Sequence, residues 1–184
     1  MENEVIKTIR SRRSTRKYKE LQITKEELQT IITAGIQAPS ANNSQSWHFT
    51  VIQNKDMINA MSDKTKEVML SSDNKNIVNF AKSPVNIFYN APTVIIVSGK
   101  KEVESSLVDC SAAIENMLLA CESIRLGAVW IGFVRYLFTL SDEVKKLNLP
   151  DGYEAFYAVS IGYKSDDSIS DPLKRNIDVV NYIK

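Results

Sequence analysis

Four arginines lie close together near the start of the chain, with short hydroxyl side chains between them, within residues 10–16 (Arg-Ser-Arg-Arg-Ser-Thr-Arg). Guanidinium groups stay charged at any working pH and present paired donors that match the oxygens of a phosphate. Such cations are costly to crowd together unless an anion divides the charge, so the stretch predicts an anion site. Taken alone, the stretch is explained equally well by a solvated basic surface or by a nucleic-acid contact, because short basic runs are a weak signal.

An uncharged polar loop is the second candidate, over residues 38–47 (Ala-Pro-Ser-Ala-Asn-Asn-Ser-Gln-Ser-Trp). Its hydroxyls and amides offer many donors and acceptors without net charge. This composition suits a neutral heterocycle with several hydrogen-bonding edges, such as the pyrimidine of a flavin. It also suits a helix-to-strand connection that satisfies its own polar groups, and turn-rich loops of that kind are common.

Several common kinds of catalytic site have no counterpart in the sequence. The chain has only six glycines and contains neither the dinucleotide-binding pattern G-x-G-x-x-G nor a phosphate-binding P-loop. Its sole histidine, His48, begins a predicted strand and has no G-x-S-x-G serine to accompany it, so a structural role is expected. Cys110 and Cys121 lie in an apolar helix, which disfavours a thiolate, and two cysteines with one histidine make no structural zinc set. We therefore expect no catalytic side chain and no metal, with any difficult chemistry carried by an organic cofactor.

Helices and strands with recognisable sequence patterns must position these residues. An amphipathic helix over residues 2–12 is expected to turn Val5, Ile6 and Ile9 inward. A second helix opens at the capping box Thr24–Glu27 and ends before Pro39. Further helices are predicted over residues 55–70, 109–126 and 141–147, with Gly127 at the C′ position of the longest one. Strands are predicted over residues 47–52, 93–97, 128–133 and 153–161, and a mobile loop or lid over residues 71–80.

The order of these elements predicts the fold class. Strands are separated by helices but do not follow a regular β-α-β order, which indicates an α+β sandwich with a mixed sheet. The 184 residues are expected to form one domain, residues 1–184. The C-terminal tail, about residues 172–184, carries much apolar surface, so we expect it to dock on something such as another subunit.

Composition and charge exclude some partners. The formal net charge is +1, from 23 basic and 22 acidic side chains, so the molecule as a whole is no general binder of polyanions such as nucleic acid. No apolar run approaches the roughly 20 residues that a membrane span needs. The first residues, Met-Glu-Asn-Glu, are acidic where a signal peptide would be basic, so a cytoplasmic protein is expected.

Taken together, the pattern resembles the FMN-dependent nitroreductase family, and most of all its short bacterial members. The stretches that match are residues 12–16, 38–47, 90–92, 109–120 and 127–132, and Lys174-Arg175. They follow the order of the family and cover nearly the whole chain. The first two are fairly specific together, whereas each of the others is weak alone.

This resemblance implies a three-layer sandwich, with a central mixed and largely antiparallel sheet flanked by helices, in an intertwined homodimer with two FMN molecules at the interface. The phosphate would be held by Arg12, Ser14, Lys174 and Arg175, with Arg13 in the same loop. Arg16 would reach the pyrimidine edge of the flavin. The ring and ribityl chain would be lined by residues of the partner subunit's loop (Pro39, Ser40, Ala41 and Asn43). The backbone at Ile131 and Gly132 would face flavin N5.

The implied activity is that of an oxidoreductase: NADH or NADPH reduces the flavin, the product leaves, and a nitroaromatic, quinone or related acceptor takes its place. The residues agree with this chemistry, because a cation at the N1–C2=O edge stabilises the reduced flavin and a backbone donor at N5 orients the reacting atom. Other readings are a flavin reductase or another flavin-dependent reaction on the same fold, a flavin-binding protein that does not turn over, and a nucleic-acid contact through residues 10–16.

Two features depart from the family pattern. Ser46 stands where the family usually has proline, which loosens the turn before Trp47. The asparagine or lysine that larger members use near residues 80–90 has no clear equivalent here, which leaves Asn76, Asn79 and Asn86 as candidates. The region of residues 71–90 would shape the substrate pocket.

Overall fold

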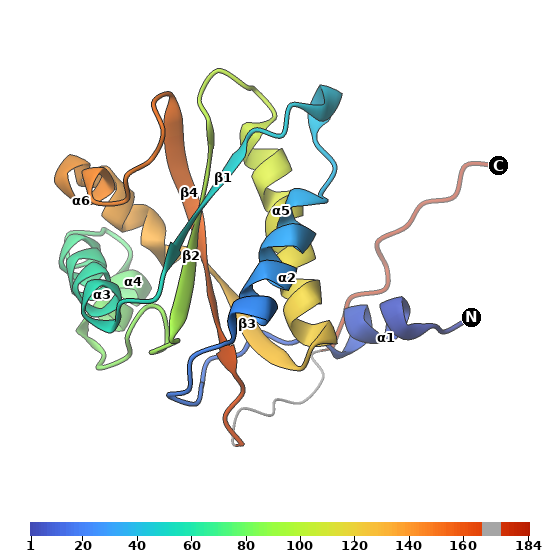
Figure 1. Cartoon of the computed structure of the whole chain (residues 1–184), viewed down its shortest axis with the longest axis horizontal. Coiled ribbons are helices and arrows are strands. Elements are labelled where there is room, and N and C mark those ends of the chain that lie inside the picture. The colour runs from blue at the N-terminus through green and yellow to red at the C-terminus, as the bar shows by residue number, and fades with distance from the viewer. Residues whose placement is uncertain (167–173) are drawn as a thin grey trace.

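The computed structural model describes residues 1–166 and 174–184 of the chain. Its centre is a four-stranded sheet in the order β1-β2-β4-β3 (Figure 1). The strands are β1 (Trp47–Ile52), β2 (Thr93–Lys100), β3 (Leu126–Ile131) and β4 (Tyr153–Tyr163), and all three pairings are antiparallel. An isolated parallel bridge between Ser14 and Ala128 adds a short segment beside β3, which makes the sheet mixed at that edge.

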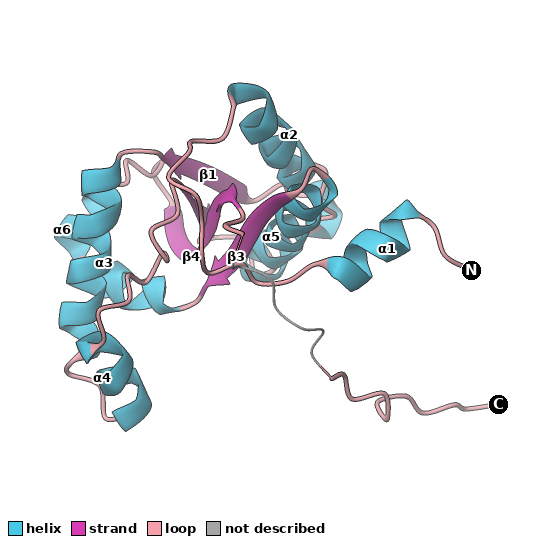
Figure 2. Cartoon of the chain, turned by 90° about the horizontal axis from the view of Figure 1, so that it is seen from below, coloured by secondary structure: helices cyan, strands magenta, loops and turns pink. Residues whose placement is uncertain are grey.

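Helices cover both faces of the sheet (Figures 1 and 2). One layer holds α2 (Lys25–Ile36) and α5 (Ser106–Ser123); the other holds α3 (Lys55–Met69), α4 (Lys75–Lys82) and α6 (Ser141–Lys145). Three further helices complete the described elements: α1 (Glu4–Ser11), η1 (Ala41–Asn43) and η2 (Phe133–Thr139). The predicted α+β three-layer sandwich is confirmed.

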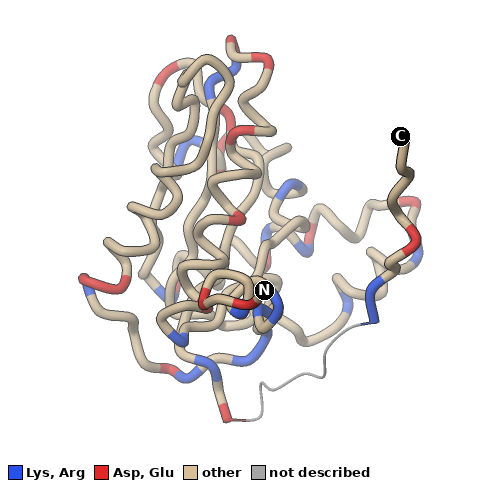
Figure 3. The backbone as a smooth tube through the Cα atoms, turned by 90° about the vertical axis from the view of Figure 1, so that its right-hand side faces the viewer, with Lys and Arg blue, Asp and Glu red and all other residues tan. Residues whose placement is uncertain are grey.

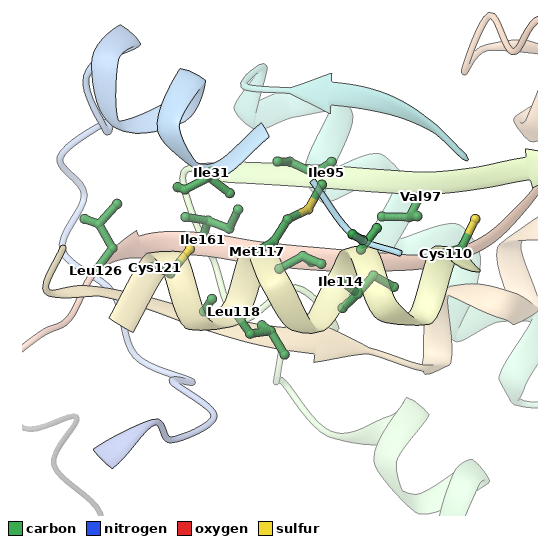
Figure 4. Close-up of a cluster of buried hydrophobic side chains, with 14 of the residues drawn as sticks. Ile31, Ile95, Val97, Cys110, Ile114, Met117, Leu118, Cys121, Leu126 and Ile161 are labelled. Carbon is green, nitrogen blue, oxygen red and sulfur yellow. The ribbon is translucent and has the colours of Figure 1, made fainter. Parts of the chain in front are cut away.

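Alternate residues of β2 fill the two cores. Ile95 and Val97 pack in the cluster with α2 and α5, which Figure 4 shows, whereas Val94 and Ile96 pack in the cluster under α3. All four side chains have no exposed surface. A strand buried on both faces reads as an unbroken apolar run, which is why β2 is the clearest strand in the sequence.

Local signals set the beginning of α2 and its contact with α5. The Thr24 hydroxyl accepts a hydrogen bond from Glu27 N–H, and Thr24 N–H donates to the Glu27 carboxylate at 2.8 Å, so the predicted capping box is confirmed. Gly35 allows the two helices to approach closely, because a Cβ at this position would lie 2.4 Å from Cε of Met117.

The loop predicted over residues 71–80 is wrong for much of that stretch, because α4 occupies residues 75–82. Asn74 caps this helix by accepting from Asn76 N–H at 2.9 Å. Its apolar residues are spaced for one helix face: Ala81 is buried, and Phe80 packs on Phe133 of η2 with ring centroids 4.9 Å apart. The many Asn and Lys residues belong to its solvent face and hide this short amphipathic pattern.

The predicted end of the longest helix is also wrong. Helix α5 ends at Ser123, and Arg125, not a glycine, takes the left-handed conformation with φ 66°. Gly127 lies inside β3, where a Cβ would meet the side chain of Thr15 at 2.6–2.8 Å. The glycine serves close approach of another segment, which is a different reason for glycine from a helix cap.

Both ends of the chain carry apolar side chains that this chain does not cover. Helix α1 leaves Val5 and Ile9 65% and 49% exposed, so the expected inner face is not buried within one chain. In the tail, 174–184, five apolar side chains are at least 59% exposed (Ile177, Val179, Val180, Tyr182 and Ile183). Figure 2 shows α1 and the tail leaving the body on the same side. Within the described part of the chain, no helix is both long and apolar enough to cross a membrane.

Candidate active site

The arginine segment, Arg12–Arg16, lies along the free edge of β3. Thr15 N–H donates to the carbonyl of Ala128 at 3.0 Å, and Ser14 pairs with Ala128 in the parallel bridge. The Thr15 side chain is buried against Gly127, so it fixes the segment on the strand. The sheet edge thereby holds the flanking arginines in a defined place. Lys and Arg positions elsewhere are spread over the molecule (Figure 3).

The guanidinium groups of this segment have few acidic partners. Nε of Arg12 lies 3.2 Å from the Glu115 carboxylate on α5, as an ion pair without hydrogen-bond geometry. Arg13 donates to the carbonyls of Arg10 and Arg12 at 2.8 Å, and its buried Nε has no hydrogen-bond partner among the described residues. Arg16 lies over the Tyr89 ring, 5.7 Å from its centroid. Donor capacity for an anion therefore remains.

The end of β3 brings two more predicted residues to the same strand. Ile131 is buried and closes β3, and Gly132 follows it at the start of η2. A Cβ at Gly132 would meet nothing within 4 Å, so this backbone borders open space. Because Ser14 pairs with Ala128, four residues before Gly132, the structure brings the arginine segment and this open backbone to one strand edge.

The loop over residues 38–46 lies on the surface between α2 and β1. Pro39, Ala41 and Asn43 are exposed and Ser40 is half-buried, so their polar groups face outward from this chain. Asn42, Asn43 and Gln45 all have positive φ, at 50°, 54° and 43°. Non-glycine residues seldom adopt this conformation, so a loop that contains three of them needs support from its surroundings.

That support comes from Asp109, a residue that sequence reasoning assigned only to the helix. Its carboxylate accepts hydrogen bonds from the loop and is 4% exposed. Burial raises the pKa of this carboxyl, but the hydrogen bonds from Ala41 N–H and from serine hydroxyls outweigh burial and leave the pKa below its ordinary value. Ser46, a departure from the family pattern, is one of the donors. An acid on the buried face of an apolar helix was the signal available in the sequence.

Lys174 and Arg175 are not brought to the arginine segment within one chain. Both are exposed and lie in the tail, where the described residues form no regular structure. The tail leads away from the body of the molecule (Figure 1). Of the residues predicted to hold the phosphate, one chain therefore brings together only Arg12, Arg13 and Ser14.

Next to Arg16 is a pocket of about 750 Å³. Arg16 is the predicted site residue among its lining, which also includes Tyr89, Asn90, Asn59 and Gln22. Tyr89 and Asn90 have positive φ of 56° and 54°. The turn at Tyr89 and Asn90 thus borders the pocket, and the Tyr89 ring in this turn contacts the Arg16 guanidinium.

The three candidate asparagines of residues 71–90 have different surroundings. Asn86 donates to Asn59 at 3.1 Å and accepts from Phe88 N–H, so its amide already stabilises the turn. Asn76 and Asn79 are exposed on α4. None of the three lines the pocket beside Arg16.

Both cysteines sit in the core of the α5 layer without exposed surface. Burial raises the pKa of the Cys110 thiol to about 12 and that of Cys121 to about 12, so both remain protonated thiols at neutral pH. Their surroundings agree with the prediction that they are buried apolar residues rather than nucleophiles.

Comparisons with known proteins identify one family. Residues 9–163 match the model of the Nitroreductase family. A protein of Archaeoglobus fulgidus, provisionally named NADH dehydrogenase/NAD(P)H nitroreductase, is 33% identical over 165 residues, which are 89% of this chain and 87% of that protein.

Two solved structures share the fold over all of both chains. The nitroreductase of Bacteroides fragilis with bound FMN has a TM-score of 0.88 at 29% sequence identity, covering 100% of each chain. The nitroreductase of Desulfitobacterium hafniense with bound FMN has a TM-score of 0.91 at 27% identity, again covering 100% of each chain.

Proposed function

The chain belongs to the Nitroreductase family, and from that premise we propose that it is an FMN-dependent NAD(P)H oxidoreductase. Its acceptor is a nitroaromatic, a quinone or a related compound. The observation that carries the proposal is the arrangement at β3, where the arginine segment pairs with the strand at Ala128 and the open backbone of Gly132 follows its last residue. A cytoplasmic location stays a prediction of the sequence.

The residues of this edge fit FMN in both charge and space. A phosphate dianion needs guanidinium and hydroxyl donors, which Arg12, Arg13 and Ser14 provide; among the described residues their one ion pair is that of Arg12 with Glu115. The Ser14 hydroxyl makes no hydrogen bond within residues 1–166 and 174–184, so it keeps its donor for a ligand. A flat ring needs backbone without side chains, and Gly132 offers open space.

Bound FMN would supply the hydride and electron transfer between NAD(P)H and the acceptor. Arg16 would hold positive charge at the pyrimidine edge and so favour the reduced cofactor, while the Tyr89 ring orients its guanidinium. The backbone at Ile131 and Gly132 would position N5, which requires no acidic side chain. The pocket of about 750 Å³ touches this site only at Arg16, because neither Ile131 nor Gly132 lines it.

We further propose that the functional unit is a homodimer. Helix α1 and the tail leave apolar side chains exposed on the same side of the molecule, which a second chain would cover. Lys174 and Arg175 would then reach a phosphate together with Arg12, and the partner subunit would contribute its loop of residues 38–46. This assembly accounts for a site that one chain completes only in part.

The direct test is the absorption spectrum of the purified protein, followed by addition of NADH or NADPH without oxygen. We expect a yellow protein that bleaches with at least one nicotinamide and regains colour with a nitroaromatic or quinone. A preparation that stays colourless after soaking in excess FMN would contradict the proposal. Bound FMN that neither nicotinamide reduces would favour a flavin-binding protein without turnover, and transfer to free flavin alone would favour a flavin reductase.

A pair of substitutions tests the phosphate site. Arg12→Ala with Arg175→Ala is expected to weaken FMN binding by at least about 100-fold, because hydrogen bonds to charged groups contribute roughly 1.5–3 kcal/mol each. The matched control is Arg10→Ala with Lys184→Ala, since Arg10 is exposed and already paired with Glu2 at 3.1 Å. Fluorescence quenching of FMN measures both affinities, and equal losses in the two variants would contradict the assigned roles.

A further inference from the structure

Asp109 is a buried carboxylate whose charge is balanced by neutral donors. Its Oδ1 accepts from Ala41 N–H at 3.2 Å, and its Oδ2 accepts from the hydroxyls of Ser44, Ser46 and Ser105 at 2.9, 3.1 and 3.1 Å. None of the ion pairs among the described residues includes Asp109. A buried charge is costly unless hydrogen bonds satisfy it. Here both carboxylate oxygens of Asp109 accept hydrogen bonds.

Three of its four donors belong to one loop. Ala41, Ser44 and Ser46 bracket the residues that have positive φ, while Ser105 precedes α5 and lies outside the loop. Within the loop, the Ser40 hydroxyl accepts from Gln45 N–H at 3.1 Å. The carboxylate therefore ties both ends of a strained turn to the rigid helix α5, and the exposed groups between them keep a fixed outline.

We propose that Asp109 is a positioning residue for the flavin site: it holds the loop of residues 40–46 in the shape that lines the cofactor. The proposal rests on the proposed function, in which this loop faces the ring and ribityl chain of FMN. Asp109 itself is 4% exposed and reaches the loop from inside the chain, so it acts through Ala41, Ser44 and Ser46 and does not touch the cofactor.

The chemistry requires a carboxylate at this position. An ionised carboxylate only accepts hydrogen bonds, which suits a site where all four neighbouring groups donate, one to Oδ1 and three to Oδ2. In Asp109→Asn, an amide nitrogen that donates replaces one oxygen: at the Oδ2 position it removes the acceptor of the three hydroxyls, and at the Oδ1 position it faces Ala41 N–H. The side chain keeps its size, which limits the change to hydrogen bonding.

The first test measures FMN binding and the spectrum of the bound flavin in full-length Asp109→Asn. We expect an affinity about tenfold lower or weaker still, together with a shifted absorption or fluorescence of the flavin that remains bound. The control Asp142→Asn removes an exposed carboxylate that pairs with Lys145 on α6, and it is expected to change neither quantity. A folded Asp109→Asn with unchanged affinity and unchanged spectrum would overturn the proposal.

A second pair of variants separates positioning from stability. Ser46 and Ser105 both donate to Oδ2 of Asp109 at 3.1 Å, but only Ser46 lies in the loop, and its side chain is fully buried. Ser46→Ala is expected to weaken FMN binding and shift the flavin spectrum, whereas Ser105→Ala leaves both unchanged.

Equal effects in the two variants would contradict the positioning role of Asp109 and leave it a structural role only. The comparison can be made even if Asp109→Asn fails to fold. Failure of the wild-type protein to bind FMN would instead overturn the proposed function, so the two failures are distinguishable.

Discussion

Gly127 lies in β3 and Gly132 directly follows that strand, yet their neighbours differ completely. A Cβ at Gly127 would press on Thr15, whereas a Cβ at Gly132 would meet nothing within 4 Å. The first glycine is needed by the chain, because it lets the arginine segment lie on β3. The second is not needed by the chain's own packing, which fits a backbone that a ligand approaches.

Substitution of these two glycines separates the roles. Gly127→Ala is expected to displace Thr15 and lower the free energy of unfolding by roughly 1–3 kcal/mol, as overpacking does, and to weaken FMN binding as the arginines move. Gly132→Ala is expected to weaken FMN binding with an unchanged free energy of unfolding. Urea unfolding and FMN titration check both. Destabilisation by Gly132→Ala equal to that by Gly127→Ala would contradict this difference.

The Asp109 carboxylate also gives the loop a defined response to acid. Its pKa lies below the ordinary value of about 3.9, so its stabilising effect is fully present above the unfolded value and is lost as pH falls through the lower folded value. The neighbouring Cys110 thiol, with a pKa raised to about 12, stays neutral throughout.

We therefore expect the stability difference between wild type and Asp109→Asn to be constant near neutral pH and to shrink below about pH 4. Urea unfolding at a series of pH values measures this difference. Asp142→Asn serves as the control, since its carboxylate is exposed on α6. A difference that persists unchanged at about pH 3 would show that the loop does not depend on the ionised form.

At the scale of elements, the sequence was informative where a pattern has one physical cause. Thr24 and Glu27 satisfy each other's backbone donors, so the start of α2 could be predicted. Strand β2 could be predicted because both of its faces are buried. The end of α5 could not be predicted from Gly127, because this glycine makes room for Thr15, which lies over 100 positions away in the sequence. Contacts of that kind leave no local signal. Helix α4 was missed because its apolar residues fall in two short pairs, Ile77-Val78 and Phe80-Ala81, among Asn and Lys.

Helix α4 offers a prediction of its own. Phe80 is its main apolar contact, packed on Phe133, and such aromatic pairs contribute about 0.5–1.5 kcal/mol beyond the area they bury. Phe80→Ala is expected to raise amide hydrogen exchange in residues 75–82 while FMN binding stays unchanged. Asn79→Ala, at an exposed position of the same helix, is the matched control. Unchanged exchange in Phe80→Ala would mean that α4 is held by other contacts.

At the scale of the whole molecule, the three-layer sandwich could be predicted, but the complete site cannot be derived from one chain. The arginine segment pairs with β3 at Ala128 through backbone contacts within the chain. Lys174 and Arg175 remain in an exposed tail. Residues at opposite termini can converge only through tertiary or quaternary contacts, which sequence patterns do not reveal; resemblance to a family was the one available guide.

The proposed dimer makes the tail the place to test assembly. Ile177→Asp with Val180→Asp puts two charges on apolar side chains that are 90% and 59% exposed in one chain. We expect the dimer to dissociate and FMN to be lost, because burying unpaired carboxylates in an interface is costly. Light scattering after size-exclusion chromatography measures the mass. Leu70→Asp, on an exposed leucine of the α3 layer, is expected to leave the dimer intact; an intact dimer in the tail variant would contradict the role of the tail.

The ion pair between Arg12 and Glu115 affects how the newly made chain can fold. A run of arginines was expected to need an anion before it could be crowded together, but α5 carries its own counter-charge. Since Glu115 gives Arg12 a counter-charge within the same polypeptide, we expect that the chain does not need bound FMN in order to fold. Folding and cofactor binding would then be separate steps, and circular dichroism of the FMN-free protein should show the secondary structure of the FMN-bound one.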